Sequence, residues 1–477
     1  MMINKHLFAI LIAILPLVIT SYMFFLKDRP VWPDESTLLV ISRTLAAKGY
    51  MATNIYNGMW ADAHIRAYFF PPVYFHVLAH WTNLFGSTIE SIRLLSILLA
   101  VICLIVFYFF CILLFQNKYI AFLATVLISS ELNFGRAARV ARMDILIFFF
   151  NLSAYYIMLL AERKNSKILY LSSGILCSLA TLTHPFGFLA PAIICSYLLL
   201  TKKSFKEKLY LIALIIIPVL LGNLLWLFSI RDTIDIFLNQ YSLQFLRKRL
   251  LEPYPITLFK QFDSFRKQFL IYGAIILAFV IKILFFRKKY DIFILLGTIF
   301  SISAVMWGKE LWYTLYFQPF IILSACAIVS LAWHQRNKII IAGVSFIVIA
   351  LFWINFIQLQ LVYKEVGGNR YDYHLYTKRI ADLIPQQASI FLSAIPDPYL
   401  DLRKNSMLSI YDMPNDEIPP DNYINLLNSV DYIILNIYSN SLLGGYLARN
   451  SDQYFYVGEP NQYSATVVKL IPRNERK

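Results

Sequence analysis

Apolar residues occur along this chain in long runs that short charged stretches separate. A helix needs about 20 consecutive apolar residues to cross the hydrocarbon core of a bilayer. By that criterion the pattern predicts about eleven membrane-spanning helices, within one or two because several runs are short. The runs cover roughly residues 7–26, 92–115, 119–130, 145–160, 168–183, 188–200, 209–230, 269–286, 292–307, 312–333 and 339–361.

Basic residues recur in every second loop between these runs. They are Lys118, Arg163, Lys164, Lys167, Lys202, Lys203, Lys206, Lys208, Arg287, Lys288, Lys289, Arg336 and Lys338. Cytoplasmic loops carry an excess of Lys and Arg, so the pattern predicts a cytoplasmic N-terminus in the plasma (inner) membrane. The first run has the length of a full span and no small-residue cleavage site, which is typical of an uncleaved helix. The remaining loops and the tail then lie outside, in the periplasm of a bacterium.

The first outer loop, residues 27–91, and the tail from residue 363 contain their own predicted elements. Apolar residues at helical spacing predict a surface helix over Glu35–Lys48. Pro71-Pro72 opens a second helix, Val73–Phe85. In the tail, runs rich in Ile, Val and Tyr predict strands at 388–394, 431–436, 454–457 and 465–470, between helices at 377–384 and 423–430. We therefore expect an all-α membrane domain, 1–362, followed by a small extracytoplasmic α/β domain, 363–477.

Composition agrees with a membrane protein. Of 477 residues, 59% are hydrophobic and 15% charged, with a mean hydropathy of +0.60 and a net charge of +15. Soluble domains carry about 25% charged residues, so a soluble globular class is excluded. The five cysteines lie in apolar runs and predict no disulfide framework. No phosphate-cradling Gly-rich loop is present, and we expect no nucleic-acid partner.

Acidic residues stand at two membrane exits. Asp34 and Glu35 follow the first apolar run almost directly, and Asp144 enters the run that begins at Ile145. A carboxylate at the edge of a span is costly unless it is paired or faces a wet cavity. For Asp144 two interpretations stay open: an ion pair with Arg142 or Arg139, or a second acidic group that faces the same cavity as Asp34.

Basic residues also occur in two of the predicted outer loops, against the general pattern. The stretch ELNFGRAARVARMD, residues 131–144, has Arg136, Arg139 and Arg142 at i, i+3 and i+6, which predicts one basic helical face. Guanidinium groups suit a phosphate because they donate bidentate hydrogen bonds, although lipid headgroup anchoring is the alternative. A second basic cluster lies within residues 247–267, with headgroup contact as likely an explanation.

These stretches together resemble the GT-C superfamily of integral-membrane glycosyltransferases, in the branch of protein O-mannosyltransferases and the lipid A aminoarabinose transferase. No single motif is specific, and the order and topology together make the resemblance. The matching pieces are Pro33-Asp34-Glu35, Phe70-Pro71-Pro72-Val73-Tyr74-Phe75, Phe85-Gly86, Ser91-Ile92-Arg93, the segment 138–144, Thr183-His184-Pro185 and the segment 313–319.

The resemblance implies transfer of a sugar from a polyprenyl-phosphate donor to an acceptor hydroxyl on the outer face. The acceptor can be a glycolipid, an oligosaccharide or a protein. A carboxylate must then serve as base, and basic groups must stabilise the leaving phosphate. We expect Asp34 as base in an inverting reaction, with Glu35 and Asp144 in support.

The remaining expected site residues hold the phosphate or contact substrate. Donor phosphate binding is assigned to Arg139, Arg142, Lys309 and Tyr316, and substrate contact to His64, His184 and Tyr313. Whether a divalent metal ion binds near the acidic pair is left open. The alternatives are a transporter or flippase, or a polymerase or ligase, of lipid-linked glycans. A transporter typically has polar groups at mid-membrane and inverted repeats, and this chain shows neither.

Overall fold

The computed structural model describes most of the chain and divides it into two compact units. The described residues are 31–55, 62–250, 266–308, 311–335, 373–412, 423–436, 441–457 and 466–470, with a few more within 6–12 and 342–353. Unit 1 comprises Met1–Met23, Arg93–Asp232 and Lys248–Glu365, and unit 2 comprises Phe24–Ile92, Thr233–Arg247 and Val366–Lys477. The first outer loop and the tail therefore share unit 2, and each unit is described by itself.

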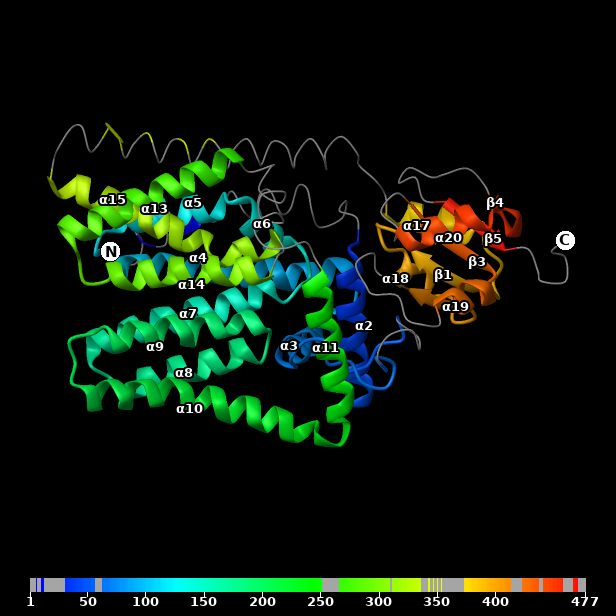
Figure 1. Cartoon of the computed structure of the whole chain (residues 1–477), viewed down its shortest axis with the longest axis horizontal. Helices are drawn as coiled ribbons and strands as arrows, with labels where there is room; N and C mark the ends of the chain where they lie inside the picture. Colours follow the sequence, from blue (N-terminus) through cyan, green and yellow to red (C-terminus); the bar gives the residue numbers. More distant parts are fainter. Residues whose placement is uncertain are drawn as a thin grey trace. The chain divides into compact units, whose positions relative to one another are not determined.

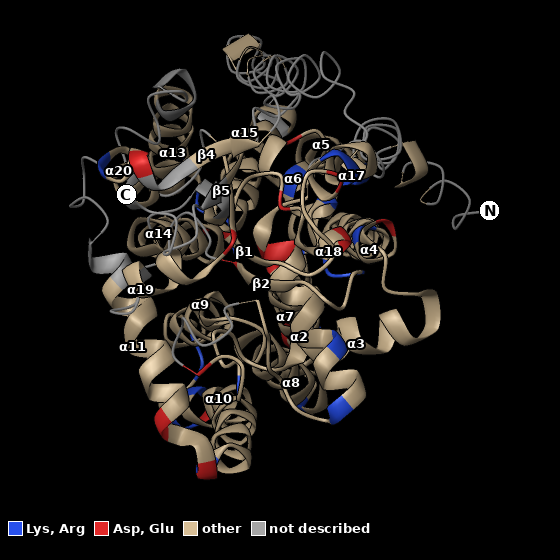
Figure 2. Cartoon of the chain, turned by 90° about the vertical axis from the view of Figure 1, so that its right-hand side faces the viewer, with Lys and Arg blue, Asp and Glu red and all other residues tan. Residues whose placement is uncertain are grey.

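Unit 1 is built from long helices that run side by side (Figure 1). They are α4 (Ile89–Phe115, which begins in unit 2), α5 (Lys118–Ser129), α7 (Asp144–Lys164), α8 (Lys167–Thr181), α9 (Leu189–Leu199), α10 (Phe205–Ser229), α13 (Arg266–Phe286), α14 (Asp291–Gly308) and α15 (Gln318–Gln335). In the described part of the chain, five segments are long and apolar enough to cross a membrane: 89–115, 144–164, 205–229, 291–308 and 313–333. Charged residues are isolated segments on otherwise tan helices in Figure 2. The prediction of a mostly helical membrane protein is confirmed; the predicted runs 7–26 and 339–361 lie largely outside the described residues.

Three short elements interrupt the long helices and position the polar side chains of unit 1. They are α6 (Leu132–Arg139), η1 (Pro185–Phe188) and η3 (Leu311–Tyr316). The helix α6 ends at Arg139 because Val140 turns to an extended conformation, with φ −106° and ψ 134°. Arg142 therefore lies beyond the helix, and the predicted helical face of three arginines is wrong for its third member.

Unit 2 begins with two helices that were predicted from the sequence, the first of which starts at Pro33 rather than at the predicted Glu35. These are α2 (Pro33–Lys48) and α3 (Val73–Phe85), which pack against each other. A proline occupies the first position of α2, where its missing N–H costs nothing. Gly49 ends α2 with φ 76° and Gly86 ends α3 with φ 84°, values that glycine adopts without strain. The chain returns to this unit at Thr233, the last residue of η2 (Arg231–Thr233), and continues into most of α11 (Ile234–Leu250).

The tail forms a five-stranded sheet with helices around it (Figure 1). Its strands are β1 (Ser389–Ser393), β2 (Ser409–Asp412), β3 (Tyr432–Leu435), β4 (Tyr454–Val457) and β5 (Thr466–Leu470), and its helical elements are α17 (Tyr373–Ala381), α18 (Tyr399–Leu402), α19 (Tyr423–Ser429), α20 (Ser441–Arg449) and η4 (Ser451–Gln453). The order is β2-β1-β3-β5-β4, with β1 parallel to β2 and β3 and the other pairs antiparallel. Phe391, Ile433 and Val468 lie side by side across three strands and pack with Leu427 of α19 and Leu447 of α20. The predicted small C-terminal sheet is confirmed, whereas β2, α18 and α20 were not predicted.

Candidate active site

A buried ion pair stands at the start of α7 in unit 1. The Arg142 guanidinium donates through Nε to Asp144 Oδ2 at 2.9 Å, and the Tyr316 hydroxyl donates to Asp144 Oδ1 at 3.4 Å. Asp144 is the first residue of α7, where the helix dipole stabilises a negative charge. Of the two interpretations left open for Asp144, the structure contains the ion pair with Arg142. The pair fixes the direction of the guanidinium, which has four further N–H donors.

A second arginine, Arg139, is buried three residues before Arg142 in the sequence. Arg139 is the last residue of α6 and is only 4% exposed. Its side chain lies against Gly135: a Cβ atom there would stand 2.5 Å from Arg139 Nη2. The glycine therefore allows a guanidinium to lie flat on its own helix. Buried guanidinium groups of this kind are common partners of phosphate oxygens.

Glu131 is a buried carboxyl that sequence reasoning did not single out. It caps the N-terminus of α6: its Oε2 accepts from the Phe134 N–H at 2.7 Å, and its Oε1 accepts from Gln318 Nε2 at 2.5 Å. Burial raises the pKa of Glu131 to about 7, although the backbone N–H bonds, Gln318 and the charge of Arg136 oppose the rise. An acidic residue directly before a short basic helix is a sequence signal for such a cap.

Aromatic rings line the same part of unit 1. Phe186 stacks on Tyr313 with ring centroids 4.0 Å apart and on Tyr316 at 5.1 Å, and His184 stacks on Phe186 at 5.5 Å. His184 Nδ1 accepts from the Phe186 N–H at 3.2 Å, so a neutral His184 carries its proton on Nε2. Five of the expected unit 1 residues are thus brought together: Asp144 with Arg142 and Tyr316, and His184 with Tyr313.

In unit 2 the two adjacent carboxylates have different surroundings. Glu35 is 0% exposed, and its Oε2 accepts from the Trp32 N–H at 3.0 Å, which caps α2. Asp34 is half-buried in the first turn of the same helix. The environment of Glu35 is that of a structural cap, which leaves Asp34 as the more accessible carboxylate of the pair.

The tail holds the backbone on both sides of α2. The Asp397 N–H donates to the Val31 carbonyl at 2.9 Å, and the Asp412 N–H donates to the Ile55 carbonyl at 3.0 Å. Both aspartates are buried, at 1% and 4% exposure. Burial raises the pKa of Asp397 to about 6; burial and then the charge of Asp397 raise the pKa of Asp412 well above its ordinary value. Sequence reasoning missed both residues.

Several expected site residues are not brought together. Asp34 and His64 belong to unit 2, and Asp144 belongs to unit 1, so a cavity shared by Asp34 and Asp144 stays a prediction. His64 is exposed in a turn. Lys309 lies outside the described residues, as do the side chains of the second basic cluster at 247–267.

Asp34 and Glu35 are the candidate ligands for a divalent metal ion. Within the residues that the structure describes, no three His, Cys, Asp or Glu side chains gather at a place where they could hold one. Glu35 already uses its carboxylate for the helix cap. The described side chains around Asp34 thus contain no such group, and a divalent ion near the acidic pair stays untested.

Comparisons with known proteins find similarity to membrane glycosyltransferases. Residues 70–226 match the family described as dolichyl-phosphate-mannose-protein mannosyltransferase. The chain is 26% identical over 220 residues to the undecaprenyl phosphate-alpha-4-amino-4-deoxy-L-arabinose arabinosyl transferase of Yersinia enterocolitica, which covers 44% of this chain and 38% of that protein. It is 25% identical to the same enzyme of Yersinia pestis, over 46% of this chain and 40% of that one. The chain thus spans about two-fifths of the length of these relatives.

Solved structures share the fold over nearly the whole chain. ArnT from Cupriavidus metallidurans bound to undecaprenyl phosphate aligns with a TM-score of 0.64 at 15% identity, covering 98% of both chains. The oligosaccharyltransferase of Archaeoglobus fulgidus tethered to an acceptor peptide aligns with a TM-score of 0.62 at 12% identity, covering 98% of this chain and 75% of that one. The resemblance to GT-C glycosyltransferases that the sequence motifs carry is confirmed by these comparisons.

Proposed function

We propose that the chain is a glycosyltransferase that moves a sugar from a polyprenyl-phosphate donor to an acceptor hydroxyl. The observation that carries the proposal is the buried cluster of Arg142, Asp144 and Tyr316, with Arg139 close by in the chain. Arg139, Arg142 and Asp144 fall inside the segment that matches the mannosyltransferase family. The Yersinia relatives are named as transferases of an undecaprenyl phosphate-linked sugar, and ArnT was solved bound to undecaprenyl phosphate. No observation favours a transporter, a polymerase or a ligase.

The donor half of the site belongs to unit 1. The bond between the anomeric carbon and the phosphate oxygen breaks, and its electron pair stays on that oxygen. Arg142 and Arg139 stabilise the negative charge that grows there, a task that oriented cations perform best in a dry site. Asp144 acts as a positioning residue, because its carboxylate holds Arg142 Nε at 2.9 Å. Lys309 and Tyr316 are the other residues assigned to the donor phosphate. Substrate contact is assigned to His184, Tyr313 and His64.

The acceptor half belongs to Asp34. The acceptor oxygen attacks the anomeric carbon on the face opposite the phosphate, which inverts the anomeric centre, and its proton passes to the Asp34 carboxylate. A base in this role contributes about 10²–10⁴-fold to the rate. Glu35 supports Asp34 indirectly, because its bond to the Trp32 N–H fixes the first turn of α2.

We also propose how the chain crosses the membrane. The chain crosses the inner membrane about eleven times, with the N-terminus in the cytoplasm and the reaction on the extracytoplasmic face. Residues 1–362 form the membrane domain, and residues 363–477 form the extracytoplasmic domain. The Lys and Arg residues at alternate loops support this orientation. The acceptor is a glycolipid, an oligosaccharide or a protein.

The test uses the full chain in proteoliposomes with a panel of radiolabelled polyprenyl-phosphate sugars and a membrane extract as acceptor source. We expect label to enter a new product, and Asp34→Asn to slow transfer by about 10²–10⁴-fold. The matched control is Asp235→Asn, because Asp235 stands at the same position in the first turn of α11 and is exposed. Near-normal transfer by Asp34→Asn would remove Asp34 as the base. Label that crosses the bilayer without entering a product would establish transport instead.

The arginine assignment is tested in the same assay. Arg142→Lys keeps the charge but loses the Nε–H donor that meets Asp144. We expect a larger loss in kcat than rise in the KM for the donor, because the charge on the leaving oxygen grows only in the transition state, with the pH profile of transfer unchanged. If Arg142→Lys shifts the pH profile of transfer and Asp34→Asn does not, the assignment of Asp34 as base and of Arg142 as phosphate ligand is wrong.

A further inference from the structure

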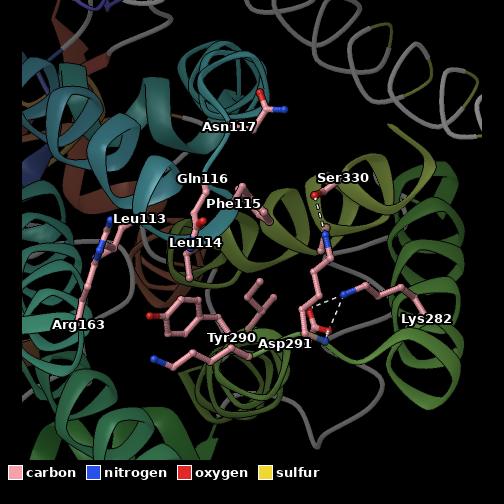
Figure 3. Close-up of a pocket in the computed structure, with 14 residues that line it drawn as sticks. Leu113, Leu114, Phe115, Gln116, Asn117, Arg163, Lys282, Tyr290, Asp291 and Ser330 are labelled. Carbon is pink, nitrogen blue, oxygen red and sulfur yellow. Dashed lines mark hydrogen bonds and ion pairs between the residues drawn. The ribbon is translucent and has the colours of Figure 1, made fainter. Parts of the chain in front are cut away.

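A cavity of about 510 Å³ opens at the end of unit 1 away from the Arg142–Asp144 pair. Its lining includes four basic residues, Arg163, Lys282, Lys288 and Lys289, and one acidic residue, Asp291. Figure 3 shows Arg163 and Lys282 on opposite sides, with Tyr290 and Asp291 between them. At 1.5 Å per residue, Arg163 lies about 28 Å along α7 from its first residue, so this basic pocket is separate from the candidate active site.

Two of the four cations already have acidic partners. Lys282 is 3% exposed, and its Nζ lies 2.6 Å from Asp291 Oδ1. Lys289 Nζ lies 3.5 Å from Glu162 Oε1. Each pair is close to neutral, so neither accounts for the charge of the remaining lining.

The other two cations leave the pocket with an excess of positive charge. Lys288 Nζ donates to the neutral Ser330 hydroxyl at 3.3 Å, and Arg163 has no carboxylate partner among the described residues. A concave site lined by charge of one sign focuses the electrostatic field and attracts an anion.

The rest of the lining indicates what kind of anion enters. Leu113, Leu114 and Ile294 form an apolar wall at the ends of α4 and α14, beside the polar Gln116 and Asn117. A volume of several hundred Å³ with apolar walls and a few polar groups is typical of ligand sites. Basic pockets between membrane helices bind phosphate headgroups of anionic lipids, whose chains then follow the helices.

We propose that this basic pocket is a binding site for the phosphate headgroup of an anionic phospholipid, held by Arg163 and Lys288. On the topology proposed above, the lipid belongs to the cytoplasmic leaflet. The inference uses no feature of sugar transfer and stands or falls independently of that function.

The experiment measures binding by the purified full chain in detergent micelles. Phosphatidylglycerol, phosphatidylcholine or inorganic phosphate is titrated in separate arms, and the bound lipid is counted by native mass spectrometry alongside the melting temperature. We expect saturable binding and a raised melting temperature with phosphatidylglycerol only. Arg163→Gln and Lys288→Gln should each weaken it about fivefold, the effect of one cation near an anionic headgroup.

The matched control is Lys164→Gln, which removes the same charge from the neighbouring position, outside the pocket lining. We expect less than about a twofold change for it. Equal losses with Lys164→Gln and Arg163→Gln would show general surface attraction and overturn the site. Equal stabilisation by phosphatidylcholine would overturn the role of charge. Stabilisation by inorganic phosphate that Arg163→Gln removes would assign the pocket to a soluble anion and overturn the lipid.

Discussion

The buried carboxyls Asp397 and Asp412 make the stability of unit 2 depend on pH. The folded state raises the pKa of Asp397 from 3.8 to about 6, because burial disfavours the ionised form. A shift of about 2 pKa units in Asp397 corresponds to about 3 kcal/mol in the free energy of unfolding, and neighbouring buried groups contribute part of this value. Asp412 changes stability in the same direction, since its pKa is also raised.

The sign follows from proton binding. Between pH 4 and 6 the folded state holds a proton on Asp397 that the unfolded chain has released. The stabilisation is therefore complete below about pH 4 and is lost as the pH rises through 6. Replacing Asp412 with Asn removes one buried ionisable group and its repulsion of Asp397. We expect Asp412→Asn to raise the free energy of opening at pH 7.5, because it removes a buried group whose ionised form the folded state disfavours.

Hydrogen exchange on the full chain measures the free energy of opening at individual amides. The amides of β1 and β2 are followed from pH 4.5 to 7.5, and the rates are corrected for intrinsic exchange. The control is Asp401→Asn. Burial alone would raise the pKa of Asp401, but hydrogen bonds from Lys404, Thr377 and His374 outweigh it and hold the pKa below its ordinary value. That variant should lose stability at neutral pH instead. Protection of β1 and β2 that is flat with pH in the wild-type protein, or steeper in Asp412→Asn, would refute the reasoning.

Two further predictions concern unit 1. Gly187→Ala places a Cβ atom 2.1 Å from the Ala180 backbone, so we expect at least about 1–3 kcal/mol of destabilisation in a thermal melt. Gly273→Ala, with nothing within 4 Å, is the control and should be neutral, so equal melting of both variants would contradict the packing argument. Glu131→Gln removes a carboxyl whose pKa is about 7, and whose stabilisation is lost as the pH rises through 7. The variant should have a higher melting temperature than wild type at pH 8, and its melting temperature should fall less between pH 5 and 8. If the melting temperature falls equally in both proteins, Glu131 is not the source of the pH dependence.

The helix ends of unit 2 were predictable because the sequence marks them locally. Pro33 opens α2, and Gly49 and Gly86 end α2 and α3 in the left-handed region. Each signal acts within one turn of the chain, so it needs no knowledge of the tertiary structure. The predicted strands β4 and β5 were likewise marked by runs of Tyr, Val and Ile.

Features that depend on distant contacts were not predictable. The periodicity of Arg136, Arg139 and Arg142 indicates one helix, but Val140 ends it, and Arg142 instead meets Asp144. The strand β2 has only four residues and ends in Asp412, a residue type that is rare in strands. Its place is set by parallel pairing with β1, about twenty residues away in the sequence.

The surroundings of the three expected catalytic carboxylates separate their roles. Asp144 is bound to the Arg142 guanidinium at 2.9 Å, so its carboxylate is already engaged in an ion pair. Glu35 is fully buried and accepts a backbone N–H bond, so proton uptake would break the cap of α2. Asp34 is the half-buried member, at the start of a helix that the tail holds through the backbone at Val31 and Ile55. A base must reach a substrate proton, and Asp34 is the most exposed of the three carboxylates, so its role as base stays the prediction to test.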